Sequence, residues 1–306
     1  MLGLLCLVVV SGTSCTLTAK EFNVPALGTM AHSFVQSFDS EYEAFKAYAE
    51  SYPDDCTLLI DTYDTINSGI VNAIKVFNEV LVPNGFRPKG VRLDSGDLAY
   101  LSKKVRKILD DAGFPDCKIC VSNSLDEFLI SSLLEQGAQI DSFGVGENLI
   151  TAKSDPVFGG VYKLVALEED GQIVPKIKIS ENVVKITNPG FKKVYRFYDK
   201  NSNKALADVI TLYDEKIPED NYKIFDPQNP WKEKTLSNYW VRPLQEQIFK
   251  NGELVYTLPT LSQICEKSKK ELDTLWPEIK RLKNPHKYYV DLSKRLWDLK
   301  NELLKK

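Results

Sequence analysis

The chain has 306 residues, of which 43% are hydrophobic and 26% charged, and its formal net charge at pH 7 is −3. These values are those of an ordinary globular protein with enough apolar residues to build a core. The small negative net charge provides no overall basic field, so the composition argues against nucleic acid or an anionic membrane as a partner.

The first ten residues, 1–10, are almost entirely apolar. This run is shorter than the ~20 residues that span a bilayer, and no basic segment precedes it, as a secretory signal would require. We therefore expect a buried strand or helix here, with no membrane anchor.

Four short apolar runs each end in a polar or glycine-containing cluster, and each is followed by a helical pattern. The runs are 58–60, 90–93, 118–121 and 140–143. This spacing is typical of βα units whose helices cover a parallel sheet. Because ligands of parallel α/β folds bind at the carboxyl ends of the strands, we expect the four clusters to share one site.

Apolar residues recur at the helical period in the segments around these strands. The predicted helices are 41–51, 67–82, 98–112 and 125–136. Gly113 and Pro115 follow the third helix and Gly137 follows the fourth, which is typical of helix C-termini.

Beyond about residue 158 the pattern changes to alternating strands that are separated by turns. Strands are predicted over 160–166, 174–179, 194–198 and 207–210, and a helix over 288–304. The chain is thus expected to have three parts: an α/β portion over 1–157, a β-rich region over 158–260 and a C-terminal helical segment over 261–306.

Six cysteines are scattered along the chain, and two of them, Cys117 and Cys120, have C-x-x-C spacing. A strand over 118–121 would point these two side chains to opposite faces, and no second pair or histidine lies nearby in the sequence. We interpret them as structural thiols rather than as a zinc or redox site. The cysteine usage favours the reducing cytoplasm.

The segment 92–97, Arg-Leu-Asp-Ser-Gly-Asp, carries the densest set of functional groups. Gly96 allows the backbone to approach a ligand, and the planar fork of Arg92 suits a carboxylate or a phosphate. Asp94 and Asp97 could cap the next helix, hold ribose hydroxyls or hold Mg²⁺. For Asp97 we expect the capping role.

Three further features are ambiguous when each is considered alone. Gly144-Val145-Gly146 after a strand is a weak phosphate-binding signal, which its place in a fourth βα unit strengthens. His32 is as consistent with a structural histidine as with a catalytic one. The pair at 192–193, Lys-Lys, follows a Pro-Gly turn and could contact a pyrophosphate or lie on the surface.

Several of these segments, in this order, resemble the nicotinate phosphoribosyltransferases. They are 28–34, 61–64, 90–98, 122–123, 144–146, 158–164, 178–193 and 285–293. The resemblance runs from about Ser11 to the C-terminus. Several long motifs in the same order make it far more specific than any single pattern in the chain.

The resemblance implies an enzyme that joins nicotinate to phosphoribosyl pyrophosphate and forms nicotinate mononucleotide and pyrophosphate, the first step of NAD salvage from nicotinate. It also implies the fold of a type II phosphoribosyltransferase, an irregular TIM-like α/β barrel with an adjoining β-rich region and C-terminal helices. ATP is the implied co-substrate, Mg²⁺ the implied cofactor and a homodimer the implied assembly.

The resemblance further implies roles for individual residues. His32 matches the histidine that ATP phosphorylates, and Asp61 matches a carboxylate that orients it. Thr29 and Arg92 match positions that bind nicotinate. The matches for phosphoribosyl pyrophosphate are Asp94, Ser95, Asn123, Gly144, Gly146 and Glu147. No residue is assigned to the metal.

Two departures from the family pattern set the alternatives. Glu147 stands where threonine is commoner, so its side chain is expected to turn away from phosphate or to hold a metal. Family members also carry a long stretch before the point where this chain begins, so we expect an N-terminally incomplete barrel with little or no activity by itself. An inactive or regulatory copy and a nicotinamide-using relative remain as alternatives, although Gly28–His32 is closer to the nicotinate enzymes.

Overall fold

The computed structural model describes residues 10–157, 159–229 and 231–305. The apolar run 1–10 therefore lies outside the described residues, apart from Val10. Contacts divide the chain into two compact units, Met1–Phe158 and Gly159–Lys306. Each unit is described by itself.

The first unit is built on a parallel sheet with strand order β1-β2-β3-β4. Its strands are β1 (Thr57–Leu59), β2 (Gly90–Leu93), β3 (Lys118–Val121) and β4 (Ser142–Phe143). Its α-helices are α2 (Thr16–Phe22), α3 (His32–Gln36), α4 (Glu41–Ser51), α5 (Ile70–Val76), α6 (Leu98–Asp111), α7 (Glu127–Glu135) and α8 (Glu147–Ile150). Strands and helices alternate from β1 to α8, which confirms the predicted series of βα units.

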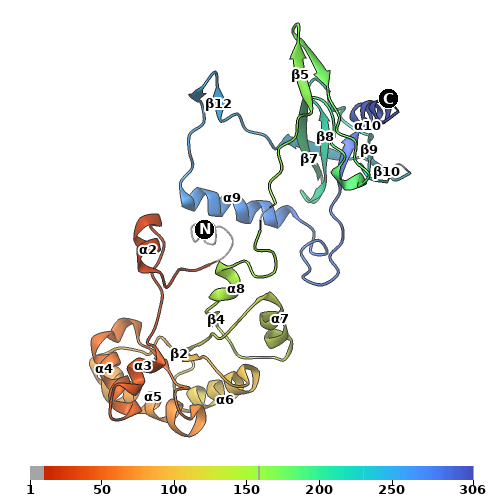
Figure 1. The fold of residues 1–306 in the computed structure, drawn as a ribbon. Helices are drawn as coiled ribbons and strands as arrows, with labels where there is room; N and C mark the ends of the chain where they lie inside the picture. The colour runs from red at the N-terminus through yellow and green to blue at the C-terminus, as the bar shows by residue number, and fades with distance from the viewer. Residues whose placement is uncertain (1–9, 158, 230, 306) are drawn as a thin grey trace. The chain divides into compact units, whose positions relative to one another are not determined.

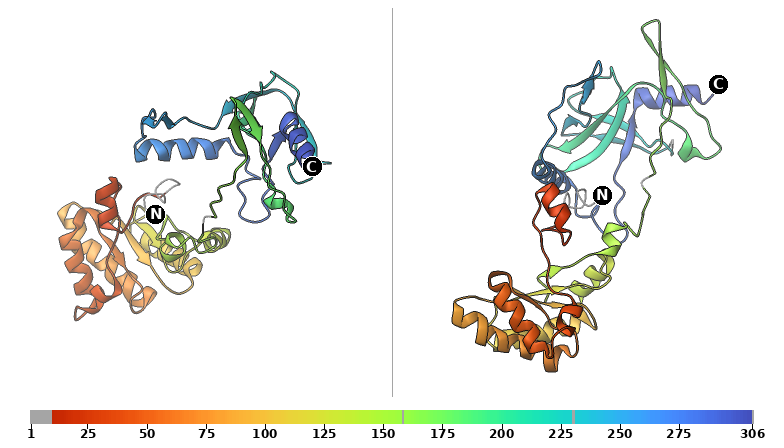
Figure 2. Two further views of the ribbon diagram at one scale, coloured as in Figure 1. Left: turned by 45° about the horizontal axis from the view of Figure 1, so that its top comes forward. Right: turned by 60° about the vertical axis from the view of Figure 1, so that its left-hand side comes forward.

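One hydrophobic core joins the strands to the helices of this unit. β1, β2 and β3 contribute residues with no exposed surface, among them Leu58, Leu93 and Ile119. α4, α5, α6 and α7 contact one another in that order, and Figures 1 and 2 show α4, α5 and α6 (orange to yellow) gathered around the strands. This sequential packing on a parallel sheet is the arrangement found in an α/β barrel.

The predicted helix 67–82 forms, but it is longer and less regular than the sequence indicates. It comprises η2 (Thr65–Gly69), α5, η3 (Phe77–Leu81) and the 3₁₀ turn η4 (Val82–Asn84), and both η2 and η3 are π-helical. Asp64 caps its start by accepting hydrogen bonds from the backbone N–H groups of Ile66 and Asn67 at 3.0 and 2.9 Å. π turns occur often at functional sites, and η2 directly follows the end of β1.

Gly69 sets how closely this helix approaches β1. A Cβ built on Gly69 would lie 1.8 Å from the carbonyl oxygen of Ile60, the residue that follows β1. Only glycine therefore allows the two backbones to pack at this separation.

The second unit centres on a six-stranded sheet of order β10-β9-β14-β8-β7-β11. These strands are β7 (Lys192–Asp199), β8 (Ala205–Leu212), β9 (Tyr222–Phe225), β10 (Glu233–Leu236), β11 (Tyr239–Pro243) and β14 (Val290–Ser293). The unit also has two hairpins, formed by β5 (Ala166–Glu169) with β6 (Gln172–Pro175) and by β12 (Phe249–Lys250) with β13 (Glu253–Leu254). Its remaining elements are the 3₁₀ turn η5 (Val183–Lys185) and the helices α9 (Leu261–Thr274) and α10 (Lys294–Leu303). β8 and β14 are parallel, and the other pairs in the sheet are antiparallel.

Three predictions for this unit are wrong in part. Residues 160–165 are not part of a strand, since β5 begins only at Ala166, and β6 ends at Pro175 rather than at Ile179. The predicted helix 288–304 is instead a strand followed by a helix. Ser293 ends β14 and caps α10 by accepting a hydrogen bond from the N–H of Leu296 at 3.2 Å, so the helix begins only after it.

Candidate active site

Three polar residues follow successive parallel strands at one edge of the sheet. Asp61 lies just beyond β1, Asp94 just beyond β2 and Ser122 just beyond β3. The N–H of Ser122 bonds to the carbonyl of Leu93 at 2.9 Å, and that of Gly144 to the carbonyl of Val121 at 2.7 Å. The polar residues that follow the strands therefore lie at one edge of the sheet, where the carboxyl ends of the parallel strands meet.

Arg92, on β2, is held by three acceptors. Its Nε donates to Ser122 Oγ at 2.8 Å, its Nη2 to Asp94 Oδ1 at 2.9 Å and its Nη1 to the carbonyl of Met30 at 3.5 Å. A guanidinium has five N–H groups, so two of them stay available to another ligand. The three hydrogen bonds fix the orientation of the side chain, and because it is 25% exposed, a ligand can reach it.

Asp94 is an ionised carboxylate between a fixed cation and a histidine. Burial acts to raise the pKa of Asp94, but hydrogen bonds from Ser122 and Arg92, followed by the charges of Arg92 and His32, lower it below its ordinary value. Its Oδ1 accepts from both Arg92 and Ser122, and its Oδ2 lies 3.5 Å from His32 Nε2.

Asp61 is the buried anchor of this edge. Its Oδ2 accepts hydrogen bonds from the N–H of Asp94 at 2.7 Å and from the hydroxyl of Ser95 at 2.6 Å. Its Oδ1 has no hydrogen-bond partner among the described residues and lies 3.9 Å from His32 Nε2. Asp61 thus faces His32, while its two hydrogen bonds fix the turn that carries Asp94 and Ser95.

His32 is the first residue of α3, and its ring is bounded by groups from the ends of β1 and β2. Its Nδ1 lies 3.1 Å from Thr62 Oγ1, and its Nε2 faces the two carboxylates of Asp61 and Asp94. The side chain is 38% exposed. The ring is therefore oriented by polar contacts on both nitrogens and stays accessible to a ligand.

Thr29 does not bring its hydroxyl to this cluster. Its Oγ1 donates to the carbonyl of Thr57 at 2.6 Å, at the start of β1. This bond anchors the segment that leads to Met30 and His32, and it is the carbonyl of Met30 that contacts Arg92.

The other predicted residues lie on two adjoining loops after β3 and β4. Asn123 is exposed and has a φ of 93°. Gly144 packs against Ser122, because a Cβ added to Gly144 would lie 3.3 Å from the Cβ of Ser122. Asn148 joins the two loops, because its Nδ2 donates to the carbonyls of Ser124 and Leu125 at 2.9 and 3.1 Å. Gly146 and Glu147 are exposed where α8 begins.

Two residues of the cluster, Ser122 and Thr62, are absent from the residues predicted for the site. Ser122 binds both Arg92 and Asp94, and its place directly after β3 was a signal that could have identified it. The position of Thr62 beside His32 depends on how two segments meet, which no local pattern predicts. Asp97 has the predicted capping role, since it accepts from the N–H of Tyr100 at 3.0 Å.

The cysteine pair agrees with the structural interpretation. Cys117 is buried and Cys120 is partly exposed, and both are free thiols. Burial raises the pKa of Cys117 to about 12, which disfavours the reactive thiolate. Among the described residues no group of three or more His, Cys, Asp or Glu side chains could hold a metal ion.

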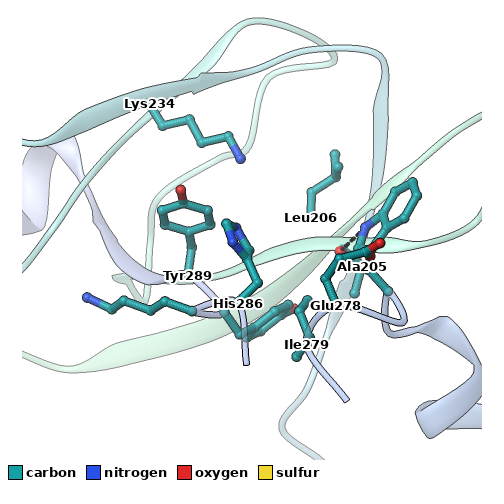
Figure 3. Close-up of a pocket in the computed structure, with 10 residues that line it drawn as sticks. Ala205, Leu206, Lys234, Glu278, Ile279, His286 and Tyr289 are labelled. Carbon is teal, nitrogen blue, oxygen red and sulfur yellow. Dashed lines mark hydrogen bonds between the residues drawn. The ribbon is translucent and has the colours of Figure 1, made fainter. Parts of the chain in front are cut away.

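The second unit holds a separate pocket of about 320 Å³. In Figure 3 the Lys234 side chain from β10 and the rings of His286 and Tyr289, before β14, face this hollow. His286 lies in the loop before β14, and its N–H bonds to the carbonyl of Glu278 at 2.9 Å. The Nζ of Lys192 donates hydrogen bonds to the carbonyls of Asn188 and Gly190, so this ammonium is already bonded within the second unit.

The pocket's charges nearly cancel, so it is a weaker candidate than the sheet edge. The Lys287 ammonium lies 3.3 Å from Asp226 Oδ2, and Glu278 adds another carboxylate to the lining.

No described helix is long and apolar enough to cross a bilayer.

Comparison with known proteins adds the family context. Residues 2–209 match the model of the nicotinate phosphoribosyltransferase (NAPRTase) family, and residues 191–300 match the nicotinate phosphoribosyltransferase C-terminal domain. The nicotinate phosphoribosyltransferase of Bacillus subtilis (strain 168) is 48% identical over 291 residues, which are 95% of this chain and 59% of that protein. The nicotinate phosphoribosyltransferase of Caenorhabditis elegans is 35% identical over 349 residues, which cover 95% of this chain and 61% of that protein.

A solved structure shows the same architecture. The crystal structure of human nicotinic acid phosphoribosyltransferase matches with a TM-score of 0.76 and 28% identity, over 96% of this chain and 65% of that one. This match confirms the predicted fold class. The chain spans 59% and 61% of the two relatives named above.

Proposed function

The chain belongs to the nicotinate phosphoribosyltransferase family, and from that premise we propose that it forms nicotinate mononucleotide from nicotinate and phosphoribosyl pyrophosphate, with release of pyrophosphate. The observation that carries the proposal is the convergence of Arg92, Asp94 and His32 at one sheet edge. Coupling to ATP through His32, and a homodimer as the assembly, are parts of the same proposal.

Arg92 recognises the carboxylate of nicotinate in this proposal. Its two remaining N–H groups offer a positive, hydrogen-bonding partner that an uncharged amide would use less well. Ser122 and Asp94 hold the guanidinium, so little conformational entropy is lost when the ligand binds. Thr29, with its hydroxyl bonded to Thr57, supports the site by anchoring the segment before His32.

The ribose and its phosphates occupy the neighbouring loops. Asp94 and Ser95, on the turn that Asp61 fixes, face the ribose, and the loops with Asn123, Gly144 and Gly146 offer backbone N–H groups to phosphate. The exposed Glu147 side chain turns to solvent. Mg²⁺ suits this donor set as an ion carried mainly by the diphosphate, because it prefers phosphate oxygens with one or two carboxylates, and it would supply neutralisation of the leaving group's charge.

His32 accepts the phosphoryl group of ATP. Its ring is a nucleophile with one nitrogen directed at two carboxylates and the other at the hydroxyl of Thr62. Asp61 and Asp94 stabilise the positive charge that the ring acquires when it is phosphorylated.

The test of the proposal is the discrimination between two mononucleotides that differ only in the pyridine substituent. We expect the chain to bind nicotinate mononucleotide at least tenfold more tightly than nicotinamide mononucleotide, because a charge-assisted hydrogen bond is worth ~1.5–3 kcal/mol. Arg92→Ala should remove most of this preference. Isothermal titration calorimetry measures both affinities.

Arg87→Ala is the matched control, because Arg87 precedes β2, at the opposite end of the strand from Asp94, and pairs with Asp116. The control should bind both nucleotides as the wild type does. Equal affinities in the wild type, or a preference that survives in Arg92→Ala, would contradict the assignment of nicotinate to this site.

A further inference from the structure

We propose that Thr62 is a positioning residue that selects the tautomer of His32. Its hydroxyl donates a hydrogen bond to Nδ1, and the ring then carries its proton on Nε2. This inference rests on the proposed function, because it concerns the histidine that is proposed to accept the phosphoryl group.

The surroundings of Nε2 favour a proton on that nitrogen. Asp94 Oδ2 lies 3.5 Å away and Asp61 Oδ1 lies 3.9 Å away. Asp61 Oδ1 is buried and has no hydrogen-bond partner among the described residues, so an N–H directed at it satisfies an otherwise unpaired oxygen. A lone pair on Nε2 would face two carboxylates and be repelled.

The surroundings of Nδ1 favour a lone pair there. With the proton on Nε2, the neutral ring has Nδ1 as an acceptor, and Thr62 Oγ1 at 3.1 Å is the donor. Thr62 lies between Asp61, which is fixed by two hydrogen bonds, and Asp64, which caps η2. The backbone that carries its hydroxyl is therefore held on both sides.

This arrangement specifies which nitrogen reacts. The Nδ1 lone pair forms the bond to the γ-phosphorus of ATP, and the bond from that phosphorus to the β,γ-bridging oxygen breaks, so ADP leaves with the electron pair. The Nε2 proton stays on the ring, whose positive charge the two carboxylates balance. Thr62 releases Nδ1 as the phosphoryl group arrives, so the product is the Nδ1 isomer of phosphohistidine.

The experiment compares Thr62→Val, which keeps the shape and removes the hydroxyl, with Thr62→Ser, which restores it. Nitrogen-15 NMR of the histidine-labelled chain reports the tautomer of His32 without ATP, and labelling with γ-³²P-ATP followed by phosphohistidine isomer analysis reports the reacting nitrogen. Thr65→Val is the matched control, because no hydrogen bond to its side chain is found in the part of the chain that the structure describes.

In the wild type we expect the Nε2–H tautomer and phosphorylation on Nδ1. Thr62→Val should slow labelling about two- to tenfold, the range that one hydrogen bond supports, and should raise the share of the other tautomer. Thr62→Ser should restore both readouts, and Thr65→Val should change neither.

Two results overturn the inference: phosphorylation of the wild type on Nε2, or an unchanged tautomer and labelling rate in Thr62→Val. If the wild type takes no label, the proposed coupling to ATP fails instead, and the NMR tautomer still decides the role of Thr62. If Thr62→Val loses helical circular dichroism, the wild type alone decides the inference: an Nδ1–H tautomer of His32 or phosphorylation on Nε2 overturns it.

Discussion

Gly69→Ala is expected to lower the free energy of unfolding of the first unit by about 3 kcal/mol or more. The new Cβ would lie 1.8 Å from the carbonyl oxygen of Ile60, a contact that only a shift of η2 away from β1 can relieve. A loss of stability would indicate this clash, because replacing glycine by alanine within a helix normally raises the free energy of unfolding by up to ~1 kcal/mol.

Urea unfolding followed by circular dichroism, with hydrogen exchange of residues 57–60, measures this effect. The four tryptophans, at 231, 240, 276 and 297, all lie in the second unit, so their fluorescence does not report on the first. Gly28→Ala is the control, because an added Cβ there meets nothing within 4 Å. A Gly69→Ala protein as stable as the wild type would mean that η2 does not pack on β1 as described.

Asp61→Ala is expected to be the most damaging single change at the sheet edge. It removes two hydrogen bonds to a buried carboxylate, from the Asp94 N–H and the Ser95 hydroxyl, each typically worth ~1.5–3 kcal/mol. We expect a loss of stability of about 3 kcal/mol or more, together with weaker binding of nicotinate mononucleotide, because the turn that carries Asp94 is no longer fixed.

Asp61→Asn removes the charge and keeps the shape. Its amide oxygen, in the place of Oδ2, can still accept both hydrogen bonds, so its effect should be smaller than that of Asp61→Ala. Asp54→Ala, at an exposed position of the 3₁₀ turn η1 (Pro53–Asp55), should leave stability and binding unchanged. Wild-type stability in Asp61→Ala, measured by the same urea unfolding, would remove Asp61 as the anchor of the site.

The parallel sheet and the place of the site could be predicted because they follow from local patterns. The apolar runs at 90–93 and 118–121 coincide with β2 and β3, since a buried parallel strand is continuously apolar. The helix cap at Asp97 is likewise a local signal. The polar residues that end the strands then meet at one edge because parallel strands all end there.

The features that escaped prediction depend on contacts between distant segments or on competing local signals. The hydrogen bond between Thr62 and His32 joins residues 30 positions apart, and the close approach of Gly69 in η2 to Ile60 likewise depends on tertiary packing rather than on periodicity. At 288–304 a helical pattern hid a strand, although the aromatic residues at 288 and 289 and the cap at Ser293 both indicate a boundary. Thr29 was assigned to nicotinate by resemblance, and its hydroxyl is engaged with Thr57.

Phosphorylation of His32 by ATP is the step on which the proposed coupling at this sheet edge depends. Mass spectrometry at neutral pH, after incubation of the chain with ATP and Mg²⁺, tests it most directly, because phosphohistidine is lost in acid. We expect one phosphorylated residue, His32, and no phosphorylation in His32→Ala. A phosphoryl group on any other residue, or none on the wild-type chain, would contradict it.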